Sequence, residues 1–331
     1  MTAQYSNVSA VPLALAVFLA TDHYDHNPDP FTISATTLLK PLRQIILPAR
    51  VPADYAVPDL ASQMANRLGS AIHDGIENAW RTNFRGALLA LGYPTKLVDR
   101  VRIDPTDQDL LDNPDIIPFY MEQRASRQIG PWTVTGKWDF IGEGRVQDYK
   151  TASTWSYKNQ VNADKQIKQG SIYRWLDPKK ITQDEMDIHH IFMDWKVGMI
   201  KSDPNYPPQR FHKQTFNLLS LQETENFIRN KIALIEKHWS TPEDQLPLCD
   251  DEELWRNEAV FKFYKSGDIN AARSTKNFDS MADARTYQAN EAKGAGAIKE
   301  VPGEVKACKY CAGFPICSQK DALIRDGQLI L

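Results

Sequence analysis

The sequence predicts a mixed α/β protein, and three observations lead to this fold class. Residues 59–91 carry apolar side chains at helical spacing, which is typical of one long amphipathic helix. Residues 132–151 contain β-prone runs on either side of a glycine-rich turn, and further strand-like and helix-like segments alternate after them. Three cysteines then lie close together in the C-terminal part. We therefore expect a core of strands and helices in residues 1–240 and a small metal-bound strap in residues 241–331.

The composition is that of a globular protein with a sizeable core. Among 331 residues, 42% are hydrophobic and 24% are charged, both ordinary values. The formal net charge of −3 argues against a generally basic nucleic-acid-binding protein. It does not argue against an enzyme that acts on nucleic acid, because a metal site is acidic and local basic patches can contact the phosphate backbone.

The N-terminal residues predict a buried helix and then a loop. Residues 11–20 are almost all apolar, and no lysine or arginine precedes Lys40, so the positive region of a secretory signal is absent. The run is too short to span a membrane, and we expect a cytoplasmic protein without a membrane partner. Residues 22–30 are polar and include candidate metal ligands, but we interpret them as a solvated loop. Residues 34–39 predict a short helix or turn.

The long helix at residues 59–91 carries one histidine of interest. Leu68, Ile72 and Ile76 recur at helical spacing and form an apolar stripe. His73 and Glu77 lie one turn apart beside this stripe. Taken alone, His73 is better explained as a packed helix histidine than as a metal ligand.

The segment at 132–151 predicts a β-hairpin that carries two carboxylates and a lysine. The turn contains two glycines, at residues 142 and 144. Asp148 and Lys150 point to the same face of the returning strand, and Asp139 on the partner strand can reach that face. Two carboxylates beside an ammonium suit a magnesium site that acts on a phosphodiester. Glu122, ahead of the hairpin, is either a further member of this site or an ordinary surface glutamate.

The remaining segments predict helices and strands in alternation. Residues 163–176 predict a helix on which Gln169 and Tyr173, four residues apart, share one face. Further expected elements are strands at 188–197 and 209–218, a helix at 221–239, a linker at 240–247, paired strands at 261–264 and 271–278, and a helix that follows Ser280.

The four cysteines predict a metal site. Cys308, Cys311 and Cys317 form a C-x2-C-x5-C pattern, and Cys249 lies further upstream. In a cytosolic protein such clustering favours metal ligation over disulfides. Four thiolates are the right number for one iron–sulfur cluster or one zinc ion, and the cysteine pattern by itself leaves both open.

The order of these motifs resembles the RecB-like branch of the PD-(D/E)XK nuclease superfamily. That branch carries a helix histidine, then G-x-x-D, D-x-K or E-x-K, and Q-x-x-x-Y. The matching residues here are His73, Gly136 with Asp139, Asp148 with Lys150, and Gln169 with Tyr173. The cysteine layout is similar to that of iron–sulfur nucleases of this branch, including the AddB nuclease domain and the nucleases of CRISPR adaptation. Over roughly residues 30–320, the amino-acid sequence most resembles those of phage-encoded exonucleases. Cys249 departs from many relatives, in which the first cysteine precedes the core.

The resemblance implies a restriction-endonuclease-like PD-(D/E)XK core, a mixed sheet flanked by helices, with a C-terminal cysteine-ligated cluster region. It implies that His73, Asp139, Asp148 and the backbone carbonyl of Tyr149 bind Mg²⁺ or Mn²⁺. It also implies that Lys150 positions the attacking water. Gln169 and Tyr173 are implied to hold the lysine or the DNA backbone. The cysteines Cys249, Cys308, Cys311 and Cys317 are implied to hold a structural 4Fe-4S cluster, with Zn²⁺ as the alternative.

The function implied is that of a metal-dependent DNA exonuclease in phage recombination, replication or degradation. Its substrate would be a single strand or a duplex end in the host cytoplasm, and a recombinase or single-strand-binding protein is a candidate partner. The alternatives are an endonuclease, a CRISPR-adaptation-like processing nuclease, or a non-catalytic DNA-binding protein with a structural metal cluster. Candidate phosphate contacts, which are equally well explained as solvated faces, are Lys158, Lys165, Lys168, Arg174, Lys262, Lys265, Arg273 and Lys276.

Overall fold

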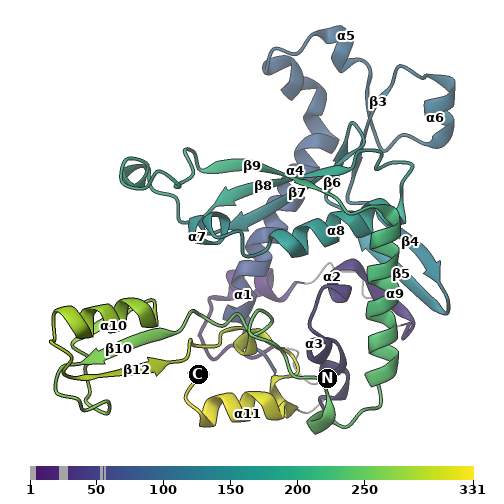
Figure 1. Cartoon of the computed structure of the whole chain (residues 1–331). Helices are drawn as coiled ribbons and strands as arrows, with labels where there is room; N and C mark the ends of the chain where they lie inside the picture. Colours follow the sequence, from purple (N-terminus) through teal and green to yellow (C-terminus); the bar gives the residue numbers. More distant parts are fainter. Residues whose placement is uncertain (1–4, 22–28, 53–54, 56) are drawn as a thin grey trace. The chain divides into compact units, whose positions relative to one another are not determined.

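The computed structural model describes residues 5–21, 29–52, 55 and 57–331. The chain forms two compact units (Figure 1). Unit 1 comprises Met1–Leu39 and Ala56–Ile232, and unit 2 comprises Lys40–Tyr55 and Ala233–Leu331. The short segment Lys40–Tyr55 therefore belongs with the C-terminal residues, although the segments on either side of it in the sequence belong to unit 1.

The apolar N-terminal run forms helix α1 (Leu13–Ala20), as expected, but the helix is not buried. Ala16 and Leu19 pack in a small core with Leu60, whereas Leu13 is 81% exposed. The expected burial is wrong for most of the helix because its apolar residues occupy every side, and only one side meets the protein. Most of the loop expected at 22–30 lies outside the described residues. Among the described helices, none has the length and apolar character that a membrane crossing requires.

The elements between α1 and the long helix are short. Strand β1 (Thr32–Ser34) leads into α2 (Ala35–Leu38), where the Ser34 hydroxyl accepts a hydrogen bond from the Thr37 N–H and so caps the helix. A 3-10 turn at Leu60–Gln63 then opens α4 (Met64–Ala90), which confirms the long helix expected at 59–91. Ile72 and Ile76 on its apolar stripe are half-buried, and Leu68 is exposed.

The rest of unit 1 alternates strands and helices, as expected. The helix at 163–176 has the predicted bounds, and the strand expected at 188–197 lies earlier in the chain, as β8. The elements are α5 (Thr95–Val98), β2 (Val101–Ile103), α6 (Asp107–Asp112), β3 (Ile117–Met121), β4 (Arg124–Ile129), β5 (Trp132–Lys137), β6 (Phe140–Gly142), β7 (Arg145–Ala152), α7 (Thr154–Lys158), α8 (Ala163–Leu176), β8 (Glu185–Phe192), β9 (Phe211–Asn217) and the first part of α9 (Leu221–His238).

These strands form two mixed sheets flanked by helices. The larger sheet has the order β2-β3-β6-β7-β8-β9, and the smaller has the order β1-β5-β4. The pairs β2–β3, β7–β8 and β1–β5 are parallel and the others antiparallel. The antiparallel pairs are more numerous, but the β7–β8 pair within the larger sheet is parallel. Parallel neighbours need a long crossover connection, which the chain through α7 and α8 provides between β7 and β8.

Helices α4 and α8 cover opposite faces of the larger sheet (Figure 1). The Tyr149 ring of β7 lies edge-on to His73 of α4. On the other side, Gly170 of α8 lies against Met186, which pairs with Val146 of β7. Successive side chains of a strand alternate between faces, so Val146 and Tyr149 mark the two faces.

The two sheets meet where one antiparallel ladder crosses from β3–β6 to β4–β5. The ladder continues through the crossing, because the Glu122 N–H donates to the Asp139 carbonyl at 3.1 Å and the Trp138 N–H donates to the Gln123 carbonyl at 3.2 Å. Glu122 has a φ of +51°, a left-handed conformation that is uncommon for a glutamate. The crossing therefore places Glu122 directly opposite Asp139.

Unit 2 contains a small antiparallel sheet and several short helices. Strand order is β11-β10-β12, and Phe263 and Phe278 pack against Tyr287 of α10. The pairing expected between 261–264 and 271–278 and the helix start at Ser280 are confirmed. The elements are α3 (Leu42–Ile46), the end of α9, β10 (Val260–Tyr264), β11 (Lys276–Phe278), α10 (Met281–Asn290), β12 (Ala297–Val301) and α11 (Ser318–Arg325), with 3-10 turns at Pro48–Arg50, Glu243–Gln245, Ala307–Tyr310 and Phe314–Ile316.

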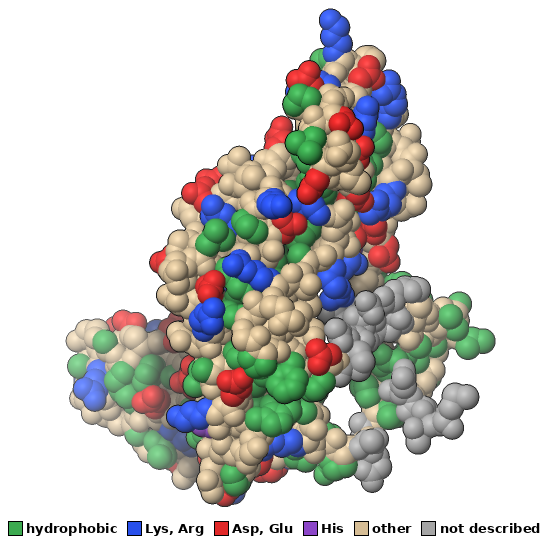
Figure 2. Space-filling model, turned by 90° about the vertical axis from the view of Figure 1, so that its right-hand side faces the viewer, with side chains coloured by type: hydrophobic (Ala, Val, Ile, Leu, Met, Phe, Trp, Pro, Cys, Tyr) green, Lys and Arg blue, Asp and Glu red, His purple; other side chains and the backbone are tan. Residues whose placement is uncertain are grey.

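The segment at 240–247 is packed and does not act as a free linker. Leu246 is buried in a core cluster with Ile46, Leu47 and Cys317. Basic and acidic side chains are interspersed on the face of the molecule shown in Figure 2, in keeping with the small net charge.

Candidate metal centre

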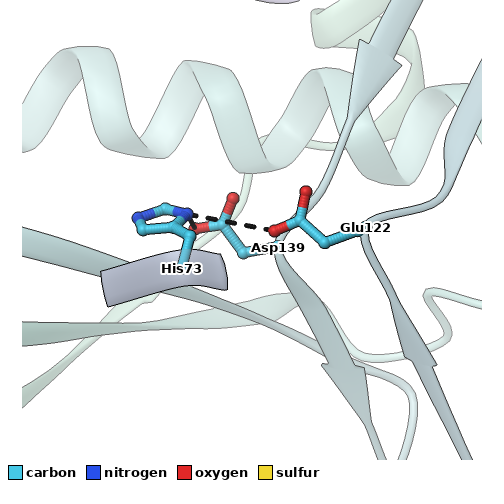
Figure 3. A group of neighbouring side chains, drawn as sticks. All are labelled: His73, Glu122 and Asp139. Carbon is cyan, nitrogen blue, oxygen red and sulfur yellow. Dashed lines mark ion pairs between the residues drawn. The ribbon is translucent and has the colours of Figure 1, made fainter. Parts of the chain in front are cut away.

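Three side chains from separate elements of unit 1 converge on one point (Figure 3). His73 comes from α4, Glu122 follows β3, and Asp139 precedes β6; one ligand atom from each lies within 4.8 Å of the other two. His73 Nδ1 is 3.3 Å from Asp139 Oδ2 and 4.0 Å from Glu122 Oε1. One imidazole nitrogen and two carboxylate oxygens form a donor set suited to Mn²⁺ or Mg²⁺.

The backbone of Tyr149 faces the same point because the neighbouring strand ends there. β6 begins at Phe140, which pairs with Gln147. Beyond this pair the Tyr149 N–H donates to Asp139 Oδ2 at 3.2 Å, and the Tyr149 carbonyl oxygen is 2.8 Å from His73 Nε2. The end of the ladder thus leaves the Tyr149 carbonyl oxygen without a partner on β6, and the His73 ring contacts it instead.

The contacts of the His73 ring would allow a bound cation to take the place of a proton on Nδ1. Its Nε2 hydrogen-bonds to the Tyr149 carbonyl, and its Nδ1 faces the Asp139 carboxylate. A neutral imidazole has only one N–H, so both contacts are satisfied only by the protonated ring or by a cation at Nδ1. Burial has the largest effect on the pKa of His73 and lowers it, but the hydrogen bond to Asp139, the charge of Asp139 and the Tyr149 carbonyl together outweigh burial, and the net shift is upward.

Asp148 and Lys150 form a buried ion pair next to this group. Asp148 is only 1% exposed, and Lys150 Nζ lies 2.9 and 2.7 Å from its two oxygens. Burial raises the pKa of Asp148 to about 6; Lys150 opposes this shift and Asp139 adds to it. Burial also lowers the pKa of Lys150, but both aspartates outweigh it and the net shift is upward. Asp139 and Asp148 lie close enough that each disfavours ionisation of the other, and a bound cation would stabilise both in the ionised form.

The space around the site suits an ion and an extended substrate. A cavity of about 10 Å³ lies between His73, Glu122, Asp139 and Tyr149, close to the volume that one water molecule or ion requires. An open groove of about 400 Å³ adjoins it. The groove is lined by the first turns of α4 and by Glu122, Lys137, Tyr149, Lys150 and Thr151.

The residues matched by the G-x-x-D and Q-x-x-x-Y patterns pack against each other. Gln169 Nε2 donates to Tyr173 Oη at 2.8 Å. The Tyr173 ring lies edge-on to Trp138 and so close to Gly136 that a Cβ there would stand 2.8 Å from it. The glycine is therefore needed for α8 to approach β5.

We expect Gly136→Ala to lower the free energy of unfolding by about 1–3 kcal/mol, because its methyl group would overlap Tyr173 and Leu176. Urea titration of the full chain measures this change. Gly198→Ala is the matched control, since nothing lies within 4 Å of an added Cβ there. Equal stability of both variants would contradict the packing argument.

Glu122 is the group member for which the sequence left two interpretations open, a member of this site or a surface glutamate. It lies outside the matched motifs, and only its cross-strand position opposite Asp139 brings it to the site. Lys137 pairs with it at 2.5 Å, and burial raises the pKa of its carboxyl despite that lysine. Glu77 lines the small cavity and pairs with Arg81.

The four cysteines all lie in unit 2 as free thiols, and Cys317 is buried. The Gln319 side chain accepts from the Cys249 N–H at 2.9 Å and donates to the Cys249 carbonyl at 2.8 Å. It thereby ties the distant cysteine to the C-x2-C-x5-C segment. Among the described residues, no three of the sulfurs lie within 4.8 Å of one another. Burial raises the pKa of Cys249 to about 12 and that of Cys308 to about 11, so these thiols are neutral until a metal displaces their protons.

Several basic residues proposed as phosphate contacts already have partners in the protein. Lys158 pairs with Asp203, and Lys168 pairs with Asp164. Lys276 lies over the Tyr287 ring at 4.6 Å. These contacts favour a structural interpretation of the three lysines.

Comparisons with known proteins gave distant similarities. No family model and no curated protein matches the chain. The crystal structure of SSO0001 is similar at 16% identity with a TM-score of 0.42, over 67% of this chain and 87% of that one. A phage related exonuclease from Haemophilus somnus 129PT is similar at 13% identity with a TM-score of 0.28, over 63% of this chain and 93% of that one.

Proposed function

We propose that this chain is a divalent-metal-dependent deoxyribonuclease of the PD-(D/E)XK type, acting as an exonuclease. The observation that carries the proposal is the convergence of His73, Asp139 and the Tyr149 carbonyl beside the buried Asp148–Lys150 pair. These groups come from α4, the β5–β6 junction and β7, and their packing supports the matched sequence motifs as one site. DNA is the proposed substrate because hard-cation ligands and a buried ammonium suit phosphodiester hydrolysis.

The metal-binding residues proposed are His73, Asp139, Asp148 and the Tyr149 carbonyl, with Glu122 as an additional carboxylate. A bound Mg²⁺ or Mn²⁺ supplies Lewis acidity at the phosphate and lowers the pKa of a coordinated water. Lys150 then has two tasks. Its ammonium orients the attacking water and balances negative charge that develops on the phosphate.

Access of the substrate is supported by the open groove beside the site. Its walls include α4 and the side chains of Lys137 and Lys150, which bring positive charge next to the acidic group. Gln169 and Tyr173 are positioning residues in this proposal, because their mutual hydrogen bond and the packing on Gly136 hold α8 against β5.

The cysteine site is proposed to bind a structural 4Fe-4S cluster, with Zn²⁺ as the alternative. The donor set supports a thiophilic metal, since four thiols and no disulfide lie in one unit. The Gln319 clamp on Cys249 supports a site that closes the C-terminal segment on itself.

Degradation of two DNA substrates tests the nuclease proposal. End-labelled linear DNA and covalently closed circular DNA are incubated with the full chain and Mg²⁺ or Mn²⁺, with a chelator control. We expect the linear DNA to be degraded from its ends and the circle to stay intact. Cleavage of the circle would instead indicate an endonuclease. Binding of DNA without degradation of either substrate would indicate a non-catalytic DNA-binding protein and overturn the proposal.

A further inference from the structure

Arg43 is a fully buried arginine in the cysteine-bearing unit. It lies on α3 and is 2% exposed, which is rare for an arginine unless it is paired. Its Nη1 donates to the Leu246 carbonyl at 3.1 Å, and its Nη2 pairs with the Glu243 carboxylate. The same Nη2 lies 3.5 Å from Cys317 Sγ. The guanidinium therefore contacts one of the four cysteine sulfurs directly.

One donor of this guanidinium has no acceptor in the described protein. Arg43 Nε is buried and makes no hydrogen bond to any described residue. A buried N–H without a partner is unfavourable and calls for an explanation. An anionic group held by the neighbouring cysteines would provide the missing acceptor for this N–H.

The charge of Arg43 also reaches other cysteines. Burial dominates the pKa of the Cys249 and Cys311 thiols and raises it, while Arg43 acts in the opposite direction on both. Arg43 thus contacts Cys317 directly and opposes the effect of burial on the pKa of Cys249 and Cys311.

The segment that carries Arg43 is packed onto the cysteine loop. Gly313 lies between Cys311 and Cys317, and a Cβ on it would stand 2.6 Å from Leu47 Cβ, so only glycine allows this approach. Glu243, the partner of Arg43, also accepts from the Ser318 N–H at 2.9 Å. Arg43 is thus linked to the residue that directly follows Cys317.

We propose that Arg43 is the charge partner of a metal group bound by the four cysteines, and that the segment Lys40–Tyr55 is therefore part of that site. Four thiolates carry more negative charge than a divalent ion neutralises, so the loaded site is anionic. Arg43 offsets part of this charge and donates to the Cys317 sulfur, the kind of outer contact that stabilises metal–thiolate bonds. The inference rests on the proposed metal binding by the cysteines and is independent of nuclease activity.

A charge partner of the metal group differs from a merely structural arginine in its effect on the metal-free protein. Without a bound metal group, the buried Nε of Arg43 has no acceptor among the described residues, so the guanidinium benefits the loaded protein more than the metal-free one. A merely structural arginine would stabilise both states equally.

The test compares wild type with Arg43→Met, Arg43→Gln and Arg43→Lys in the full chain. Each metal-free protein is loaded anaerobically with ferrous iron and sulfide, and separately with Co²⁺. Metal retained against a chelator and the thiolate-to-metal absorption bands are then measured. Arg50→Met is the matched control, because Arg50 lies in the same segment and donates to backbone carbonyls of Thr241 and Trp239.

We expect Arg43→Met and Arg43→Gln to weaken metal retention about 10–100-fold, with Arg43→Lys intermediate and Arg50→Met close to wild type. We also expect the melting temperature of the metal-free protein to fall less than that of the loaded protein. Wild-type retention in both neutral variants, or equal destabilisation of the two states, would overturn the proposal. Failure of wild type to bind either metal would overturn it together with the cysteine metal site, while DNA degradation, measured separately, would still decide the nuclease proposal.

Discussion

Lys150→Ala and Asp148→Asn are each expected to reduce Mg²⁺-dependent DNA degradation by on the order of 10³-fold or more while the fold stays intact. Lys150 is the cation that lies within 3 Å of both Asp148 oxygens. Its removal takes away the group proposed to orient water. It also removes the interaction that holds the Asp148 pKa down against burial, so that carboxyl takes up a proton more readily and binds a metal less well.

Asp148→Asn separates these two effects. The amide keeps the size of the carboxyl, but it cannot supply a negative charge to the metal. Lys150 keeps an attractive interaction with Asp139 in this variant, so we expect it to remain charged. A raised Mg²⁺ requirement is therefore expected for Asp148→Asn in addition to the loss of rate.

The measurement is the initial rate of release of label from linear DNA over a range of Mg²⁺ concentrations. Lys213→Ala serves as the control, because Lys213 is an exposed lysine on β9 of the same sheet and lies outside the candidate site. Circular dichroism and thermal melting establish that each variant is folded. Wild-type rates in folded Lys150→Ala or Asp148→Asn protein would exclude the site assignment.

Metal removal from the cysteines is expected to destabilise unit 2, so that it opens locally and becomes susceptible to proteases, while unit 1 stays folded. Structural metals bound by thiolates contribute roughly 10–16 kcal/mol of apparent binding free energy, which is comparable to the whole stability of a domain. The cysteines contribute to the two small cores of unit 2, around Leu246 and around Leu254. Protein purified anaerobically is expected to be brown and to contain iron and acid-labile sulfide.

Limited proteolysis with mass-spectrometric mapping, before and after chelation, locates the residues that open. We expect new cleavage sites within 233–331, whereas cleavage within the sheet of unit 1 stays unchanged. A variant with all four cysteines replaced by serine is the control, because its cleavage pattern is expected to be insensitive to the chelator. Colourless protein with one zinc per chain would indicate the zinc alternative. A cleavage pattern that chelation leaves unchanged would contradict a structural role for the metal.

Local patterns in the sequence predicted several individual elements, mainly α4 and those from residue 132 onward. Helix α8 has the predicted bounds, and residues 163–176 contain no proline that would interrupt a helix. Their one glycine, Gly170, lies where Met186 packs closely against the helix. Of the hairpin predicted at 132–151, residues 140–152 form the β6–β7 hairpin, whose turn at Glu143 and Gly144 has positive φ, which glycine favours. Residues 132–137 instead form β5 of the smaller sheet. The helix and the hairpin turn depend on neighbouring residues and are therefore visible in the sequence.

Other features depend on which distant segments meet, and the local patterns did not show them. Helix α1 is apolar on every side, so nothing in its sequence indicates that Leu13 and Val17 stay exposed. Glu122 reaches the candidate metal centre only because the ladder that crosses between two sheets pairs it with Asp139. The parallel pairing of β7 with β8 is likewise a property of the whole sheet.

The sequence by itself determined the kinds of groups available: a helix histidine, two hairpin aspartates with a lysine, and four cysteines at metal-binding spacing. Only the tertiary structure decided how they are completed. Glu122 joins the first group because the crossing ladder places it opposite Asp139, and the Tyr149 carbonyl faces His73 because β6 begins only at Phe140. Arg43 joins the cysteines because α3 packs on their loop. The physical reason is that side-chain chemistry and short-range spacing are properties of the chain, whereas burial and charge pairing arise when segments far apart in sequence exclude water together.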